Sequence, residues 1–321
     1  MKRIELHTHL EGSLTPDRLV ALASKYGQPG LPLTCLNATG DAFKFNGFLG
    51  FLDLFKDATS VIRTPADFHA VTLDLGEQLA RDNVSYAEVI VSYGVMQVRD
   101  MDPVPVQKAI REAADQILES RGITMRFVPD AIRQFGLDHA MRAWEAAATC
   151  GRQLGVVGFG IGGDEANGPA SGFSGLFAEV RGEGLGVSIH AGELTSMGQA
   201  GADSVRQAVE DCGATRIGHG LAAASDPLVM GLLAAREVFV EMCPRSNVKT
   251  GNLEQLADHP LRIFLDAGIP CCLNTDDRTM FGLDLTSEYD EAAAVFHLTE
   301  KEIAAMQDQA RRAAFSDLPA D

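Results

Sequence analysis

The sequence predicts an α/β protein: a closed (β/α)8 barrel with an extended helical insertion after its first strand. Short β-like segments recur along the 321 residues, and stretches with apolar residues three or four apart separate them. Alternating strands and helices imply a parallel sheet with right-handed crossovers. A doubly wound open sheet is the structural alternative. Barrels of this length form one domain, so we expect a single domain over 1–321.

The expected strands occupy eight short segments along the chain: Arg3–Leu6, Ser85–Val91, Thr124–Val128, Val156–Ile161, Val187–Ile189, Arg216–Gly218, Val238–Met242 and Pro270–Leu273. Helical spacing lies between them, in Pro105–Ser120, His139–Leu154, Gly175–Glu183 and Asp203–Cys212. The insertion after the first strand contains the Phe- and Leu-rich segment Phe45–Val61 and a helix-like run, Pro65–Arg81. Long insertions after barrel strands usually form a lid or a pocket wall.

The composition limits the classes of partner. Apolar residues make up 46% of the chain and charged residues 22%, with a formal net charge of −17. Nucleic acid is held mainly by Lys and Arg, so we expect no nucleic-acid partner. No apolar run approaches membrane-spanning length, so we expect no membrane partner and a cytoplasmic protein. The six cysteines show no metal-binding spacing and are expected as buried thiols. The oligomeric state is not indicated.

Histidines and acids follow the predicted strands. His7 and His9 are two apart on the first strand and therefore point to one face. His190 ends the fifth strand and Asp276 follows the eighth. In a parallel barrel the carboxyl ends of the strands converge on one mouth, where active sites lie. Imidazoles and a carboxylate there can bind a divalent metal and still leave room for water.

Further polar residues follow the same strand ends. Glu193 comes three residues after His190, across a glycine, where a desolvated carboxyl can donate a proton near neutral pH. His219 stands between two glycines after the sixth strand and could orient or deprotonate a water. Gly163 offers a backbone N–H where a ligand can approach closely. The glycines here also fit a dinucleotide fingerprint, but two of them lie inside the strand and Asp164 follows, so we reject that interpretation.

At this level of detail the chain resembles the adenosine deaminases and their close relatives in the amidohydrolase superfamily. The matching motifs occur in the family's order over nearly the whole chain: residues 7–13 (HTHLEGS), 163–165 (GDE), 190–193 (HAGE), 218–220 (GHG), 243–247 (CPRSN) and 273–277 (LNTDD). Together these motifs are highly specific, although no single one would be. The resemblance implies the (β/α)8 fold and a small-molecule purine substrate.

The resemblance also implies a role for each site residue. One Zn²⁺ per chain would be held by His7, His9, His190 and Asp276. By the same resemblance, Glu193 would protonate purine N1 while zinc-bound hydroxide attacks C6, and His219 would orient that hydroxide. Asp277 would orient the hydroxide or bind N7, and the Gly163 amide would face N3. An apolar lid over the substrate would be formed by Phe51, Leu52 and Phe55, with Phe48.

Two positions bear on the substrate. Glu11 stands where many adenosine deaminases carry an Asp that contacts the ribose, and we expect its carboxylate at the pocket rim. Arg278 follows the acid pair, where it could contact an anionic substituent or pair with Asp284. The Gly-Gly-Asp-Glu loop favours a 6-aminopurine nucleoside over free adenine or 6-amino-6-deoxyfutalosine. A non-catalytic barrel scaffold is a further alternative, although every ligand, acid and base position is intact.

Overall fold

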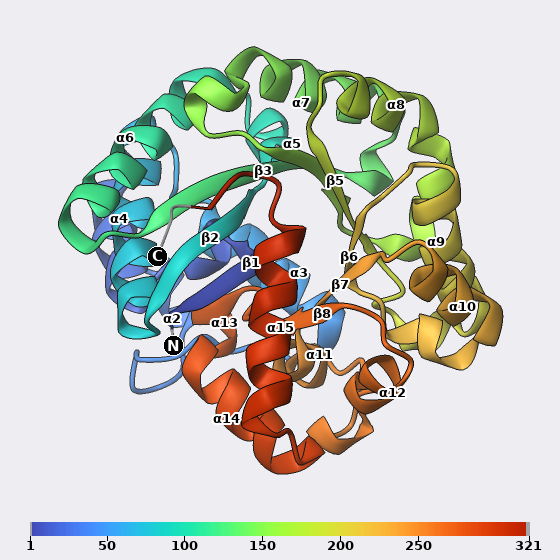
Figure 1. Cartoon of the computed structure of the whole chain (residues 1–321). Helices are drawn as coiled ribbons and strands as arrows, with labels where there is room; N and C mark the ends of the chain where they lie inside the picture. Colours follow the sequence, from blue (N-terminus) through green and yellow to red (C-terminus); the bar gives the residue numbers. More distant parts are fainter. Residues whose placement is uncertain (1, 319–321) are drawn as a thin grey trace.

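The computed structural model of the protein describes residues 2–318 and is built around one eight-stranded parallel sheet. The strands follow in the order β1 to β8 (Figure 1). Their bounds are β1 Arg3–His9, β2 Val84–Val91, β3 Thr124–Ile132, β4 Gly158–Gly162, β5 Gly186–Ala191, β6 Arg216–His219, β7 Phe239–Met242 and β8 Cys271–Leu273. All eight predicted strands overlap these segments, because the short apolar runs lie buried between the barrel interior and the helices.

The sheet closes on itself between its first and last strands. A parallel bridge joins Thr8 to Asp276 just beyond β8. The Asp276 N–H donates to the His7 carbonyl at 3.1 Å, and the His9 N–H donates to the Asp276 carbonyl at 3.0 Å. The predicted (β/α)8 barrel is therefore confirmed, and the doubly wound open sheet is wrong.

Helices surround the barrel on all sides (Figure 1). Their bounds are α1 Pro16–Lys25, α2 Leu31–Cys35, α3 Gly47–Thr59, α4 Pro65–Arg81, α5 Tyr93–Val98, α6 Pro103–Arg121, α7 Leu137–Cys150, α8 Ser174–Gly182, α9 Gln199–Glu210, α10 Pro227–Ala235, α11 Pro244–Lys249, α12 Leu261–Asp266, α13 Arg278–Phe281, α14 Leu285–Phe296 and α15 Glu300–Ala313. Short 3-10 turns, η1 Glu11–Ser13 among them, complete the connections.

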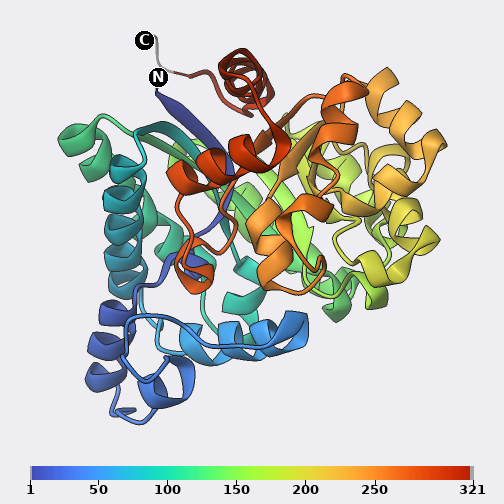
Figure 2. The same ribbon diagram turned by 90° about the horizontal axis from the view of Figure 1, so that it is seen from below.

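The insertion after β1 folds as α1 to α4. In α4 the Thr64 hydroxyl caps the Asp67 N–H while Asp67 caps the Thr64 N–H, and Pro65 takes the first helical position. Helix α3 carries the predicted Phe- and Leu-rich segment. Figure 2 shows α1 to α3, in blue, at one end of the barrel and α15, in red, at the opposite end. The insertion therefore stands over the carboxyl-end mouth.

The amino end of the barrel is filled by a buried charged cluster. The Arg216 guanidinium forms ion pairs with Glu88 and, at 2.5 Å, with Glu241. The Phe315 ring stacks over this guanidinium at 3.8 Å, and the Phe315 N–H donates to Glu88 at 2.6 Å. Although burial raises the pKa of Glu241, Arg216 and His7 lower it to about 2. The charges at this end are therefore paired with one another.

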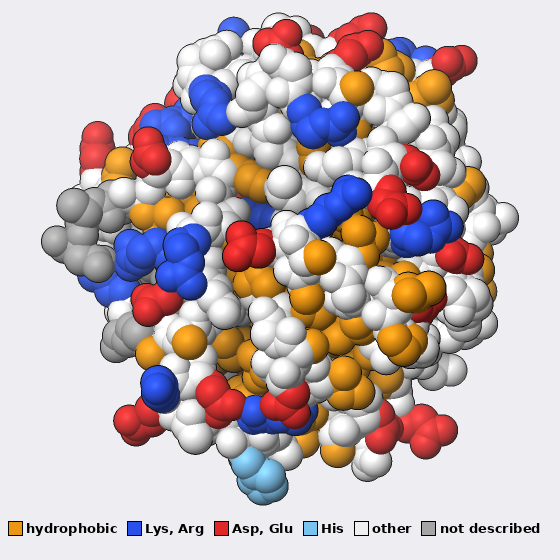
Figure 3. All heavy atoms as spheres, turned by 45° about the vertical axis from the view of Figure 1, so that its right-hand side comes forward, with side chains coloured by type: hydrophobic (Ala, Val, Ile, Leu, Met, Phe, Trp, Pro, Cys, Tyr) orange, Lys and Arg blue, Asp and Glu red, His pale blue; other side chains and the backbone are white. Residues whose placement is uncertain are grey.

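The surface and the cysteines agree with the composition. On the face in Figure 3, acidic and basic side chains are interspersed among apolar ones. Across residues 2–318, no helix has both the length and the apolar character needed to cross a membrane. All six cysteines lie within the described range and are buried as free thiols, as expected.

Candidate metal centre and active site

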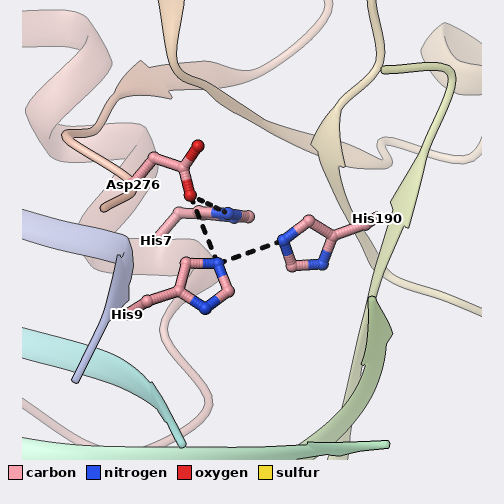
Figure 4. Close-up of side chains that lie close together, drawn as sticks. All are labelled: His7, His9, His190 and Asp276. Carbon is pink, nitrogen blue, oxygen red and sulfur yellow. Dashed lines mark hydrogen bonds and ion pairs between the residues drawn. The ribbon is translucent and has the colours of Figure 1, made fainter. Parts of the chain in front are cut away.

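Four of the predicted side chains meet at the carboxyl-end mouth. His7 and His9 extend from β1, His190 from β5, and Asp276 from the turn after β8 (Figure 4). Their ligand atoms all lie within 4.8 Å of one another. His9 Nε2 lies 3.3 Å from His190 Nε2 and 3.2 Å from Asp276 Oδ1, and His7 Nε2 lies 3.7 Å from the same oxygen. Figure 4 shows these atoms pointing toward one another.

The donor set fits a divalent metal. His7 Nδ1 contacts Glu241 Oε2 at 2.7 Å, an arrangement that fixes the tautomer and leaves Nε2 as the acceptor facing the other ligands. His7 Nε2 is buried and has no hydrogen-bond partner among the described residues. Such an orphan atom is rare in a folded interior. Three imidazoles and one carboxylate form a mixed N/O set of the kind zinc prefers.

Backbone strain marks two residues of this site. Asp276 has a φ of +62° and His219 a φ of +66°, a region that non-glycine residues seldom adopt. Such conformations persist where the surrounding structure imposes them, and they cluster at functional sites. The Ser246 hydroxyl donates to Asp276 Oδ2, and Asn247 Nδ2 lies 3.1 Å from His219 Nδ1. The start of α11 thus fixes both side chains.

Glu193 lies beside the four ligands without belonging to their set. Its side chain is buried, and burial, followed by the negative charge of Asp276, raises its pKa to about 8. The carboxylate of Glu165 accepts the backbone N–H groups of Glu193 and Leu194 at 3.1 and 3.4 Å. These hydrogen bonds hold the loop that carries Glu193. The sequence alone does not predict this role for Glu165, which is part of the GDE motif. The result is a buried carboxyl with a raised pKa, held beside the candidate metal site.

His219 and Asp277 also face the site. His219 Nε2 lies 3.8 Å from Glu193 Oε2, and burial lowers the pKa of His219 to about 3. Asp277 is buried, and its Oδ1 has no partner within the described part of the chain. A Cβ at Gly12 would lie 1.8 Å from this oxygen, so only glycine fits there. The turn after His9 therefore leaves room for the second acid of the pair.

A cavity of about 680 Å³ opens onto these residues. The predicted lid residues line it on the side of α3, namely Phe48, Phe51, Leu52 and Phe55. Gly163, with a φ of +93°, lines it after β4. The volume lies within the range of small-molecule sites, and most of the lid wall is apolar. The structure therefore brings the predicted ligands, acids, glycine and lid around one cavity.

Two residues lie elsewhere than expected. Glu11 is 2% exposed and is not among the residues lining the cavity; the η1 turn directs it inward, and its Oε1 accepts the Ser92 N–H at 3.1 Å. The expected position at the rim therefore differs from the structure. Arg278 is buried and pairs with Asp82, with Glu5 at 3.8 Å, instead of Asp284. Asp284 caps the N-terminus of α14 through the Ser287 N–H.

Sequence comparisons place the chain among purine deaminases. The family model described as "Adenosine deaminase" matches residues 2–321. An aminodeoxyfutalosine deaminase of Acidothermus cellulolyticus is 36% identical over 295 residues, which covers 91% of this chain and 82% of the relative. An adenine deaminase of Mesorhizobium japonicum is 34% identical over 315 residues, covering 98% and 94% of the two chains.

A solved structure gives the same answer for the fold. The crystal structure of an adenine deaminase from Arthrobacter aurescens matches with a TM-score of 0.87 and 26% identity, over 98% of this chain and 94% of that one. The structural match covers nearly all of both chains and therefore includes the complete barrel. The chain belongs to the adenosine deaminase family of the amidohydrolase superfamily, and it is a deaminase, a hydrolase of C–N bonds that acts on adenine-like substrates.

Proposed function

We propose that the chain is a zinc-dependent hydrolytic deaminase of a 6-aminopurine nucleoside, of the adenosine-to-inosine type. The observation that carries this proposal is a buried carboxyl, Glu193, beside a compact three-histidine, one-carboxylate site in a single cavity. Deamination of an aromatic ring needs this pair of functions: a proton for the ring nitrogen, and a nucleophile for the adjacent carbon.

The metal would be held by His7, His9, His190 and Asp276. When bound, it lowers the pKa of a water molecule and so supplies a nucleophile at neutral pH. Glu241 fixes the His7 tautomer and keeps Nε2 turned toward the other ligands.

The chain's own side chains assist the addition of water to C6, after which the bond from C6 to the exocyclic nitrogen breaks and ammonia leaves. Glu193 donates its proton to purine N1, which makes C6 electrophilic. The neutral His219, next to Glu193, orients the attacking water. Asp277 binds purine N7 or helps to orient the water through its unpartnered oxygen. Gly163 directs its N–H to N3, and the Phe51, Leu52 and Phe55 wall excludes water from the ring.

The second candidate acts by the same chemistry on free adenine or on 6-amino-6-deoxyfutalosine. The names of the two relatives above favour it. The size of the cavity, about 680 Å³, favours a substrate larger than the free base.

Substrate profiling separates the candidates. Adenosine, adenine, aminodeoxyfutalosine and N6-methyl-AMP are each incubated with the zinc-loaded protein, and ammonia release is measured together with the loss of adenine absorbance. We expect the highest kcat/KM for a nucleoside. A higher value for adenine would assign the chain to the base deaminases, and no ammonia from any of the four would favour a binding scaffold.

A further inference from the structure

An acidic residue that the chemistry above does not use lies in the same cavity. Asp130 lies near the carboxyl end of β3, paired in register with Gly160 of β4, and lines the cavity with 5% of its surface exposed. Its Oδ1 is buried and has no hydrogen-bond partner among residues 2–318. Ser92, directly after β2, lines the same cavity.

The position of Asp130 is not that of a structural acid. No ion pair with Lys or Arg holds it within the described structure, in contrast to the buried acids at the amino end of the barrel. Burial raises its pKa well above the ordinary value. A buried polar atom without a partner is unfavourable, and native structures seldom keep one without a use.

The neighbouring strand keeps the Asp130 carboxyl free. A Cβ at Gly162 would lie 3.1 Å from Asp130 Oδ2. With no side chain at Gly162, which lines the cavity, β4 leaves space beside the carboxyl. Asp130 and Ile132 are two apart on β3 and therefore point to the same face, and both line the cavity.

The proposed orientation of the purine determines what would lie over Asp130. With C6 at the metal ligands and N1 at Glu193 after β5, N3 faces Gly163 after β4. The ring edge beyond N3 carries N9, and the next strands around the barrel are β3 and β2. Asp130 and Ser92 project from those two strands, so they lie on the side of the N9 substituent.

We propose that Asp130 binds a hydroxyl group of the sugar attached to purine N9, and so selects nucleosides over the free base. This inference rests on the proposed function. The carboxyl group accepts a hydrogen bond from the hydroxyl, so its unpartnered oxygen gains a partner when substrate binds.

Glu11 then acts from behind the sugar site. Its Oε1 accepts the Ser92 N–H, which fixes the end of β2 beside Asp130, while the Glu11 side chain itself does not reach the cavity. Glu11 is therefore a positioning residue for this site, and Asp130 touches the substrate.

The test is a thermodynamic cycle between enzyme and substrate. Wild-type protein, Asp130→Ala and Asp130→Asn are assayed with adenosine, 2′-deoxyadenosine, 3′-deoxyadenosine, 5′-deoxyadenosine and adenine, with Glu11→Gln as the matched control. We expect Asp130→Ala to lower kcat/KM for adenosine about ten- to a hundredfold, mainly through KM, and to leave adenine nearly unchanged. Asp130→Asn, which keeps a donor and an acceptor, should restore most of the loss.

The cycle also identifies the hydroxyl. One deoxynucleoside should be a poorer substrate than adenosine for the wild type, by a similar factor, and should lose nothing further in Asp130→Ala. Glu11→Gln should have a smaller effect than Asp130→Ala on every nucleoside. Equal losses for adenine and adenosine, or no loss for adenosine, would overturn the assignment of Asp130. Wild-type protein that prefers adenine to adenosine would instead contradict the nucleoside function itself.

Discussion

Both ends of the barrel interior bury polar and charged side chains, but the two ends differ in whether the buried polar atoms have partners within the protein. At the amino end, Arg216 lies between Glu88 and Glu241, and Phe315 covers its guanidinium. At the carboxyl end, His7 Nε2, Asp277 Oδ1 and Asp130 Oδ1 are buried with no partner among the described residues.

The difference separates structural charge from functional charge. A buried group whose partners belong to the protein contributes to a fixed interior, whereas an orphan group is satisfied only when something else binds. In this chain these three unpartnered atoms belong to residues near or just beyond the carboxyl ends of parallel strands, where the fold places a catalytic mouth. Variants at the two ends should therefore fail in different ways, and four predictions test this.

The largest effect is expected from removing a ligand at the mouth. His9→Ala should lower the bound zinc well below one ion per chain and abolish activity, and a chelator should abolish activity in the wild type. Metal content is measured by elemental analysis of the purified protein. Thermal unfolding of the metal-free forms serves as the control, and full zinc occupancy in the variant would contradict the ligand assignment.

Glu193→Gln should separate chemistry from metal binding. We expect kcat to fall by roughly two to four orders of magnitude, because the amide cannot donate a proton to N1. Zinc content and the unfolding midpoint should stay near the wild-type values. Near-normal turnover, or loss of the metal, would show that the role of Glu193 is different.

A variant at the amino end should fail by unfolding. Arg216→Met leaves Glu88 and Glu241 buried without their cation, and the free energy of unfolding should fall by about 3–5 kcal/mol. The matched control is Arg206→Met in α9, whose exposed pairs with Asp203 and Glu210 should contribute at most about 1 kcal/mol. Denaturant unfolding measures both variants. Equal denaturation midpoints for Arg216→Met and Arg206→Met would contradict a structural role for the buried charges at the amino end.

The smallest effect concerns pH. Because burial raises the pKa of Glu193 to about 8, its carboxyl is protonated at neutral pH and loses its proton as the pH rises through 8. Activity should therefore be retained below that value and fall about tenfold per unit above it. His219, with a pKa of about 3, should add no titration between pH 5 and 8. A profile of kcat/KM that stays level to pH 10 would contradict this.

The sequence predicts the barrel, and the meeting of the candidate ligands at its mouth, for one reason: both depend on local sequence pattern and on the topology of the sheet. Apolar periodicity locates the strands, and parallel strands bring their carboxyl ends together, so histidines that follow strands must converge. Contacts between distant segments leave no such trace. Asp130 follows its predicted strand as the histidines follow theirs, but it belongs to none of the matching motifs. Glu241 lies inside a predicted strand, so neither residue is selected from the sequence.

Pairings across the chain were equally hidden. Arg278 pairs with Asp82, nearly two hundred positions away, although the nearby Asp284 is the simpler expectation from the sequence. Glu11 follows His9 by two residues, and an extended strand would direct both side chains to the same face. The strand ends at His9, and the η1 turn changes that direction. The alternation of side-chain directions along β1 cannot be extended by two residues to Glu11, because the strand has ended at His9.

Three positions, Phe315, Gly158 and Gly186, are linked by close packing around the Phe315 ring, so we expect substitutions at them to be correlated. A Cβ at Gly186 would lie 2.2 Å from this ring, and a Cβ at Gly158 would lie 2.7 Å from it. The Phe315 ring therefore fits only while both positions are glycine, because a Cβ at either position would clash with the ring. In a homologue with alanine at 186, we expect a smaller residue at 315. Correlated substitution among these three sites, far from the chemistry, should be a signature of this branch.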